Sequence, residues 1–324
     1  MNNKTLKISE QKHKRKTILI IGFGQVGKKI LAMKSFSKEL RSMKFVCACR
    51  TEIREKKLYQ KQTSFLSIDV DHKKNIERLA NLCDRLIVLT PTNDSRKFKK
   101  DNLIDTRMHN LKLAMLKNNN WKKKGVYIST TGVYGNKKGI TVDETESCYP
   151  TTKRSSRRLY AERILRNLQF HILRVPGIYS IDRLPILRLQ RAVPALNDYE
   201  DVYTNHIHET DLAKISYFAL FRGKPHRITN AVDNSNLKMG QYFDLIASAV
   251  GLEKPPRVSL KEIKNLEKSE KISPMAASFF YESRRLKNNR LKKEIKTIFD
   301  YPTVQDFIKK NGKNLSTLRQ KLFQ

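Results

Sequence analysis

The chain has 324 residues, 39% of them hydrophobic, which is enough to bury a large core. It contains no run of about 18 apolar residues, which excludes a membrane-spanning helix. The first sixteen residues are polar and basic and lack the apolar segment of a secretory signal, so we expect a disordered basic tail over 1–16 and a cytoplasmic location. The four cysteines form no C-x-x-C pair and have no clustered histidines, so the sequence predicts neither a metal site nor a disulfide framework.

The chain is strongly basic, with 66 lysines and arginines against 31 acidic residues and a net charge of +35. Such a balance is typical of proteins that bind nucleic acid or anionic membranes. Here the basic residues are spread through the tail, helices and loops, and no helix-turn-helix, zinc finger or RNP-type strand accompanies them. We therefore expect no specific nucleic-acid partner and only weak, salt-sensitive adhesion to polyanions. The pattern favours a general composition bias toward Lys, Asn and Ile across the surface as the source of the charge.

The most informative stretch near the N-terminus is a predicted buried strand, Thr17–Ile21, that runs into three glycines and then a helical pattern. In this arrangement Gly22 makes the turn, Gly24 lets the backbone approach a pyrophosphate, and Gly27 lets the helix pack against the strand. The anion would sit on unpaired N–H groups at the helix start, those of Gln25 and Val26. The sequence therefore predicts a dinucleotide-binding turn, the alternative being a turn that is merely glycine-rich.

The residue after the second predicted strand, Lys44–Cys49, bears on the choice of coenzyme. A carboxylate there would bind the ribose 2′-hydroxyl of NAD, whereas an arginine suits the 2′-phosphate of NADP. The chain has Arg50 at this position, with Arg54 nearby. The pattern favours NADP over NAD, unless Arg50 only caps a loop.

A third strand is predicted over Ser64–Ile68, and Asp69 directly after it could face the adenine. Asp71 is expected to cap a helix that begins with His72.

The fourth predicted strand, Arg85–Leu89, runs into Thr90, at the carboxyl edge where such sheets bind ligands. A helix is predicted from about Asn102 to Lys117. Its expected solvated face carries Asp105, Arg107 and Lys112. A fifth strand follows at Gly125–Ile128.

The segment after the fifth strand, Ser129-Thr130-Thr131-Gly132-Val133-Tyr134-Gly135, resembles the S-S-x-x-V-Y-G motif of extended short-chain dehydrogenases/reductases, which include nucleotide-sugar epimerases and dehydratases. Further matches are Asp143-Glu144, Ala161-Glu162, Leu173–Tyr179, Ile207–Ala213 and Ile228–Ala231. The resemblance spans residues 17 to 310. It implies a Rossmann-type, doubly wound parallel α/β sheet over 17–175, completed by 206–232. It also implies a smaller C-terminal substrate lobe from 176–205 and 233–324, and a homodimer through the helices on either side of the fifth strand.

In that family a Tyr, whose pKa is lowered by a Lys four residues on, moves the proton, and a Ser or Thr holds the substrate hydroxyl. Thr130 matches the Ser/Thr, although a β-branched strand residue is also ordinary there. Counted back from Glu162, the Tyr and Lys positions hold Arg154 and Arg158. Arginine stays protonated and has no acceptor, so neither can act as the general base.

A literal Tyr-x-x-x-Lys does occur, as Tyr149 and Lys153, five residues earlier than the family places it. Pro150 favours the first helical position, which would put Tyr149 at the cap or outside the helix. The pair is a candidate catalytic dyad or a coincidence.

The pattern from Pro150 to Glu162, with Arg183-Leu184-Pro185 downstream, resembles an atypical bacterial branch of the superfamily whose members are nucleoside-diphosphate-sugar-epimerase-like proteins of undefined substrate. Arg154 and Arg158 lie one helical turn apart and would point toward the nicotinamide end of the cleft. Such a cation pair suits a phosphate or carboxylate of the substrate.

Four further polar residues have simpler interpretations. Arg157 and Glu162 could occupy a solvated helix face. His206 and His208 alternate on a short strand; His208 matches the family's structural His and is expected in the core or at a helix cap. His206 is a weaker candidate for proton transfer.

The sequence as a whole predicts an NAD(P)-dependent oxidoreductase or epimerase-like enzyme that acts on a small anionic or nucleotide-linked substrate. The alternative is a catalytically inactive dinucleotide-binding sensor or scaffold, because Arg154 and Arg158 occupy the acid/base positions. The resemblance implies the fold more firmly than the reaction.

Overall fold

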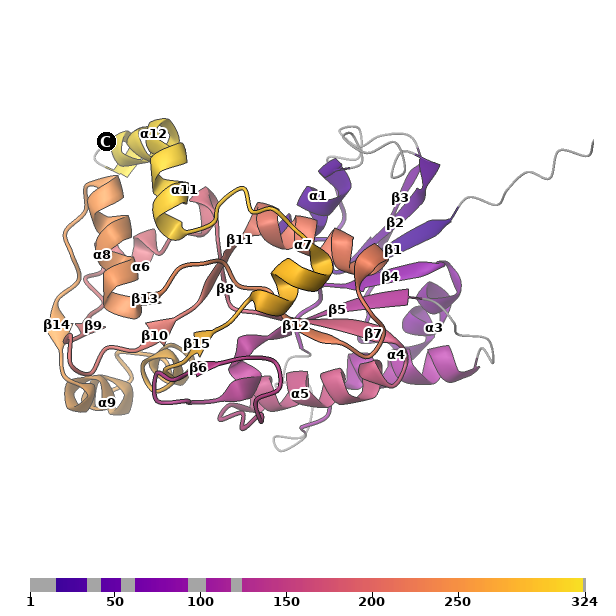
Figure 1. Ribbon diagram of the computed structural model, residues 1–324, viewed down its shortest axis with the longest axis horizontal. Helices are drawn as coiled ribbons and strands as arrows, with labels where there is room; N and C mark the ends of the chain where they lie inside the picture. Colours follow the sequence, from indigo (N-terminus) through magenta and orange to yellow (C-terminus); the bar gives the residue numbers. More distant parts are fainter. Residues whose placement is uncertain (1–15, 34–41, 54–61, 93–102, 118–123, 323–324) are drawn as a thin grey trace, which may run out of the picture.

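The computed structural model of the chain describes residues 16–33, 42–53, 62–92, 103–117 and 124–322 (Figure 1). Residues 1–15 of the predicted basic tail, and Arg54, lie outside the described residues.

The centre of the molecule is a seven-stranded sheet in which every neighbouring pair is parallel. Its strands are β1 (Thr17–Ile21), β2 (Lys44–Cys49), β3 (Thr63–Ser67), β4 (Arg85–Val88), β5 (Lys124–Thr130), β7 (Phe170–Val175) and β12 (Ile228–Asn230). The spatial order is β12-β7-β5-β4-β1-β2-β3, so the chain winds outward in both directions from β1 and β4. Ligands bind such sheets at the carboxyl ends of the strands, where the order reverses. The predicted doubly wound α/β sheet is confirmed.

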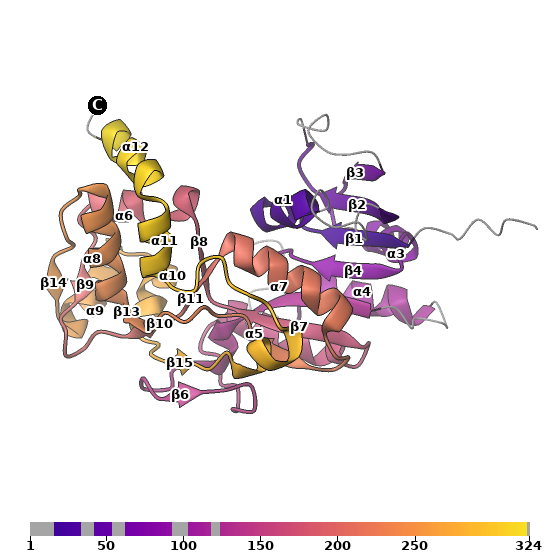
Figure 2. The same cartoon turned by 45° about the horizontal axis from the view of Figure 1, so that its top comes forward.

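Helices cover both faces of the sheet (Figure 2). One face carries α1 (Gln25–Ala32) and α7 (Glu209–Arg222); the other carries α3 (Lys73–Asn81), α4 (Thr106–Lys117) and α5 (Lys153–Arg166). Side chains alternate along β1: Ile18 and Ile20 pack with α1 and α7, whereas Leu19 and Ile21 pack with the other three helices. Because both faces are covered, the strand is apolar throughout, and this continuous apolar run allowed the strand to be predicted from the sequence.

The predicted solvated face of α4 is wrong at its N-terminal end. The described part of the helix begins at Thr106, later than predicted, so Asp105 lies before the first turn. Its side chain is 1% exposed and accepts the N–H of Met108 at 3.2 Å, as an N-cap does. Burial raises the pKa of this carboxyl. Lys112 is only partly exposed.

Arg107 is buried as well, and its partner corrects a second prediction. The guanidinium holds both carboxylate oxygens of Asp71, at 2.6 and 3.0 Å, and donates to the carbonyl of Pro91 at 2.9 Å. Asp71 does not cap α3, whose N-cap is His72 with no side-chain hydrogen bond. The ion pair instead ties the loop after β3 to the start of α4.

The C-terminal part of the chain builds a lobe with its own core, in which Tyr179, Leu196, Phe243 and Phe307 are buried together. Its elements are β8 (Gly177–Tyr179), α6 (Ile186–Gln190), β9 (Ala195–Leu196), β10 (Tyr203–Thr204), β11 (His206–His208), β13 (Leu237–Lys238), α8 (Met239–Val250), β14 (Arg257–Val258), α9 (Leu260–Lys268), α10 (Pro274–Ala277), β15 (Arg285–Leu286), α11 (Val304–Lys310) and α12 (Gly312–Leu322). β15 pairs with β6 (Thr141–Val142), which follows β5 in the chain, so the lobe is joined to the sheet half beside the strand ends (Figure 1).

Candidate functional site

The glycine turn after β1 has a geometry that explains each glycine. Gly22 has φ +94°, and a Cβ there would lie 2.7 Å from the backbone nitrogen of Thr90, so a side chain is excluded. A Cβ on Gly24 would meet nothing within 4 Å. A Cβ on Gly27 would lie 3.1 Å from the Phe23 ring and 3.5 Å from Leu89. The turn therefore packs tightly at its first and third glycines and opens to free space at the second.

The first turn of α1 leaves its N–H groups available to an anion. Gly24 is the N-cap and supplies no side-chain hydrogen bond, and the first turn carries no acidic residue. The N–H groups at a helix start have no partner within the helix and lie at the positive end of its dipole. Gln25 and Val26 also line the adjoining cavity. This arrangement suits a phosphate.

Two cavities meet at the glycine turn. The main cavity, of about 690 Å³, lies between the turn, the ends of β5 and β7, the start of α5 and the lobe. The side cavity, of about 760 Å³, lies at the ends of β2, β3 and β4. They share Gly22, Gly24, Leu89 and Pro91. Of the predicted site residues, the main cavity is lined by Gly22, Gly24, Gln25, Val26, Gly27, Thr130, Arg154 and Arg158, and the side cavity by Gly22, Gly24, Arg50, Asp69 and Thr90.

Two of the basic residues that line the side cavity lie at the end of β2 and on α1. Arg50 follows β2, and Lys28 reaches the same cavity from α1. One carboxylate oxygen of Asp69 accepts the N–H of Asp71 at 2.9 Å. The hydroxyl of Thr90 is buried and has no hydrogen-bond partner among the described residues. A buried polar atom without a partner is costly, so this hydroxyl fits a site completed by a ligand.

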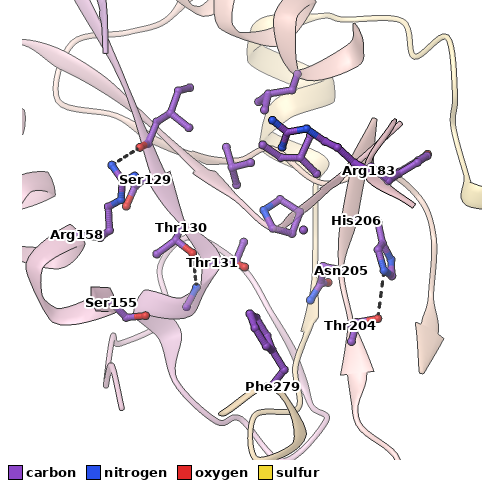
Figure 3. A pocket seen from close by; sticks show the side chains of 18 of the residues that line it. Ser129, Thr130, Thr131, Ser155, Arg158, Arg183, Thr204, Asn205, His206 and Phe279 are labelled. Atoms are coloured by element: carbon purple, nitrogen blue, oxygen red, sulfur yellow. Dashed lines mark hydrogen bonds between the residues drawn. The ribbon is translucent and has the colours of Figure 1, made fainter. Parts of the chain in front are cut away.

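Thr130 lies in the main cavity at the end of β5, as the family pattern requires. It caps the short helical turn Thr131–Tyr134, and its Oγ1 accepts the N–H of Gly132 at 3.2 Å. This bond uses a lone pair and leaves the hydroxyl hydrogen for a ligand. In Figure 3, Thr130, Ser155 and Arg158 lie on one side of the cavity, and Arg183 and His206 on the other.

Arg154 and Arg158 both line the main cavity, but their guanidinium groups do not act together. Arg158 donates to the Tyr127 hydroxyl at 2.8 Å and to the carbonyl of Ile128 at 3.0 Å. Arg154 extends toward the lobe, where its Nη1 lies 3.9 Å from the sulfur of Met275. Arg158 is thus anchored to β5, and Arg154 bridges toward α10.

The structure does not bring Tyr149 and Lys153 to the cavity. Tyr149 is 70% exposed, with the Lys137 ammonium 5.1 Å above its ring, and neither Tyr149 nor Lys153 lines either cavity. The expectation that Pro150 opens the helix is wrong: α5 begins at Lys153, with Thr152 as its N-cap. The geometry gives the proposed dyad no support.

The inner face of α5 is buried, which corrects the solvated positions predicted for Arg157 and Glu162. Glu162, 1% exposed, accepts hydrogen bonds from the Arg174 guanidinium at 2.8 Å and from the Ser129 hydroxyl at 2.5 Å. Arg174 in turn lies 4.6 Å above the ring of Tyr134. This network fixes α5 against the ends of β5 and β7, directly behind the main cavity.

The buried phenols near the cavity are held in their protonated form. Tyr134 donates to the side-chain oxygen of Asn230 at 2.7 Å, and burial raises its pKa to about 12. Burial also raises the pKa of Tyr179 and Tyr242, which line the cavity. None of these three phenols titrates near neutral pH.

The two histidines of β11 have different roles. His208 accepts the N–H of Thr210 at 3.2 Å and caps α7, so the expected core or capping role is confirmed. His206 is buried and lines the main cavity, with its ring stacked on Tyr242 at 4.3 Å between centroids. Burial lowers the pKa of His206 to about 4, so the imidazole is neutral at pH 7.

The lining of the main cavity is strongly positive. Its described residues include a single carboxylate, Glu282, which is bound by Arg284 at 2.7 Å and by the Thr151 hydroxyl. The lining arginines are Arg154, Arg158, Arg183, Arg188 and Arg284. Sequence reasoning missed Lys28 and Arg107 in the side cavity and Arg188 here, because no motif or periodicity distinguishes them from the many other basic residues.

The described residues lack two features. None of their helices has both the length and the apolar character needed to cross a membrane. In the same part of the chain, no three His, Cys, Asp or Glu side chains cluster as metal ligands would.

The sequence matches no known family profile and no curated protein. Solved structures share its fold. A protein of unknown function from Silicibacter pomeroyi superposes with a TM-score of 0.67 at 21% identity, over 94% of this chain and 99% of that one. UDP-glucose 4-epimerase from Thermotoga maritima, solved with UDP-glucose, superposes with a TM-score of 0.70 at 14% identity, over 95% of this chain and 100% of that one. UDP-glucuronic acid 4-epimerase from Bacillus cereus, in complex with NAD, superposes with a TM-score of 0.68 at 15% identity, over 95% of this chain and 100% of that one.

The parallel sheet, its winding order and the glycine turn define a Rossmann-type α/β protein. The solved structures narrow this class: the chain has the fold of these UDP-sugar 4-epimerases, one of which was solved with UDP-glucose and the other with NAD. This is the fold that the motif Ser129–Gly135 and its companions predicted.

Proposed function

We propose that this protein is an NAD(P)-dependent epimerase-like or oxidoreductase enzyme acting on a small anionic or nucleotide-linked substrate. The observation that carries the proposal is the glycine turn, whose Gly24 faces open space beside the uncapped start of α1. A dinucleotide diphosphate would bind those N–H groups. The coenzyme would then lie across the wall that the two cavities share, with the orphaned Thr90 hydroxyl available to it.

The chain's own residues would orient the substrate. When bound, a nicotinamide coenzyme accepts or donates a hydride. Thr130 would donate its free hydroxyl hydrogen to a substrate oxygen in the main cavity. Arg158, anchored to Tyr127 and Ile128, would hold a fixed positive charge beside it. Such fixed charge stabilises negative charge that develops on a substrate oxygen.

Calorimetric titration with NADPH and NADH at low ionic strength tests the proposal. We expect saturable binding of one coenzyme per chain. Gly24→Val should abolish it, because the new side chain fills the space kept for the diphosphate, while folding is unchanged since a Cβ there meets nothing. Gly312→Val is the matched control: its Cβ also meets nothing, and the residue begins α12 away from both cavities. If the folded wild type ignores both coenzymes at millimolar concentration, the proposal fails.

We further propose NADP as the preferred coenzyme, because Arg50 and Lys28 line the same side cavity. Two cations suit the 2′-phosphate of NADP better than a bare ribose hydroxyl. Arg50→Glu should weaken NADPH binding by about tenfold or more and leave NADH binding unchanged or tighter. Lys44→Glu makes the same charge change at the other end of β2, outside both cavities, and should affect neither coenzyme. Equal losses for both coenzymes in Arg50→Glu would contradict this preference.

A second candidate function is a coenzyme-binding sensor or scaffold without turnover. It is favoured by one observation: the family's acid/base positions hold Arg154 and Arg158, and Tyr149 lies outside the cavities. Deuterium transfer separates the two: from 4-deuterated NADPH to a panel of ketones, and from carbon-deuterated sugar nucleotides to NADP⁺, which oxidises the alcohol to a ketone. Transfer in either direction supports the enzyme, whereas coenzyme binding without any transfer supports the sensor.

We also propose a homodimer formed through α4 and α5, as the family resemblance implies. These helices pack side by side on one face of the sheet, and Leu116 on α4 is exposed. Sedimentation equilibrium should give twice the mass of the chain, and Leu116→Glu should lower it; a monomer at all concentrations would rule this out.

A further inference from the structure

The end of the main cavity that lies in the lobe contains an arginine whose charge is not neutralised. Arg188, on α6, has its guanidinium packed 4.4 Å from the Phe243 ring centroid and 5.1 Å from that of Phe280. Nη2 donates to the carbonyl of Pro194 at 3.1 Å, and Nε is buried with no partner. No carboxylate of the described residues forms an ion pair with it. Burying a cation without an anion is costly, which makes this a place where an anionic ligand would be stabilised.

A second arginine lies close by in the chain and on the same wall. Arg183 ends the short turn Ile181–Arg183 that precedes α6, and its side chain lines the main cavity. The side chain is exposed, and within the described part of the chain no hydrogen bond or ion pair engages its guanidinium. Figure 3 shows Arg183 beside His206, across the cavity from Thr130. The two arginines therefore line the same cavity as Thr130, and Arg183 lies on the side opposite it.

The other arginines of the cavity are held by neighbouring groups, although the Nε of Arg284 is buried without a partner among the described residues. Arg158 donates to Tyr127 and Ile128, and Arg284 binds Glu282. Arg154 lies against Met275 of α10. Arg158 and Arg284 are therefore fixed in place by hydrogen bonds, whereas the exposed Arg183 side chain can reorient toward a ligand.

We infer that Arg183 and Arg188 form a subsite that binds the oxyanion of the substrate, a carboxylate or a phosphate. This inference rests on the proposed function in one respect, that the main cavity holds a substrate. Each planar guanidinium can donate two parallel hydrogen bonds to such a group. The neighbouring rings of His206, Tyr242 and Phe243 form an uncharged wall for the part of the molecule that carries the anion. Substrates would thus be recognised at two points, an oxygen at Thr130 and an anion in the lobe.

Calorimetric titration of the full chain with inorganic phosphate and with succinate tests the subsite. NADPH is present to occupy the glycine turn, and ionic strength is held constant with chloride. We expect one phosphate or succinate per chain, bound at least tenfold more weakly by Arg183→Gln and by Arg188→Gln. Arg191→Gln is the matched control: it removes the same charge from an exposed residue at the end of α6, outside the cavity, and should change affinity less than twofold.

The outcomes separate this inference from the proposed function. Arginine-dependent binding of phosphate alone identifies phosphate esters as substrates, and of succinate alone identifies carboxylates; both results support the subsite. If all three variants lose affinity equally, or neither anion binds stoichiometrically, the subsite is refuted even where NADPH binds normally. If phosphate binding depends on Arg183 while NADPH does not bind, the subsite stands and the proposed function falls. Arg183→Gln decides the question if Arg188→Gln does not fold, because Arg183 is exposed.

Discussion

The glycine turn and the lobe wall of the main cavity are built by different means. At the turn, backbone geometry dictates the residue: Gly22 has a positive φ and touches the backbone of Thr90, so one amino acid fits. At the lobe wall, side chains such as Arg188 and His206 are brought together by packing between distant segments. A site made by the backbone leaves a local pattern in the sequence, whereas a site made by packing does not. The four predictions that follow test how far this contrast extends.

The largest effect is expected at the ion pair behind the cavity, which is made by packing. Glu162→Ala leaves the buried Arg174 guanidinium without a carboxylate, so we expect a loss of about 3 to 5 kcal/mol in the free energy of unfolding. Urea denaturation measures it. Glu77→Ala is the control, since Glu77 pairs with Lys117 at the surface and should have no measurable effect. Equal losses in both variants would remove the distinction.

The stability of the protein is expected to depend on which glycine of the turn receives a methyl group. Gly22→Ala should cost about 3 kcal/mol of stability, because the Cβ meets backbone atoms at a positive φ. Gly24→Ala should cost much less, since its Cβ has free space. Thermal or urea unfolding of the two variants compares them directly. Equal stability of the two would show that backbone geometry does not select Gly22.

His206 in the lobe wall should make the free energy of unfolding depend on pH. The imidazole of His206 has an ordinary pKa of 6.5 when unfolded and about 4 when folded, because of burial. Between these values the unfolded chain binds a proton that the folded chain does not. The contribution of His206 to stability is therefore full above pH 6.5 and falls by about 3 kcal/mol as the pH drops to 4, and the buried His171 and His208, whose pKa is also lowered to about 4, add to the fall.

The slope of unfolding free energy against pH measures how many more protons the unfolded chain binds than the folded chain. His206→Phe should lower this number by up to one, whereas His72→Gln, at an exposed position, should leave it unchanged. Denaturation curves at five pH values between 4 and 7 measure the slope. An unchanged slope in His206→Phe would show that His206 is not held neutral.

The smallest effect concerns the orphaned hydroxyl of the side cavity. Thr90→Val should leave stability equal or raise it by about 1 kcal/mol, because it removes a buried polar atom without a partner. The same change should weaken coenzyme binding several-fold. A loss of stability with unchanged coenzyme affinity would mean that Thr90 serves the fold and not the ligand.

The sheet and the glycine turn were predictable because apolar strands and glycines at fixed spacing are local features. The family motifs extended this to Thr130 and to the capping role of His208. Asp105 and Arg107 were placed wrongly because the start of α4 was set too early, and a shift of a few residues turns a cap into a solvated position. Glu162 was misjudged because its partner, Arg174, lies on another element. Arg188 and Lys28 could not be singled out, since nothing local marks one basic residue among 66.

The wall of Gly22, Gly24, Leu89 and Pro91 that divides the two cavities has a practical consequence. A nucleotide fragment such as 2′,5′-ADP, which resembles only the adenine half of NADP, could fill the side cavity and leave the main cavity open. It should therefore compete with the coenzyme without competing with an anion at Arg183. Separate compounds could then block the side cavity and the main cavity independently. A single compound that links a ligand for each cavity would bind more tightly, because the second binding event becomes intramolecular.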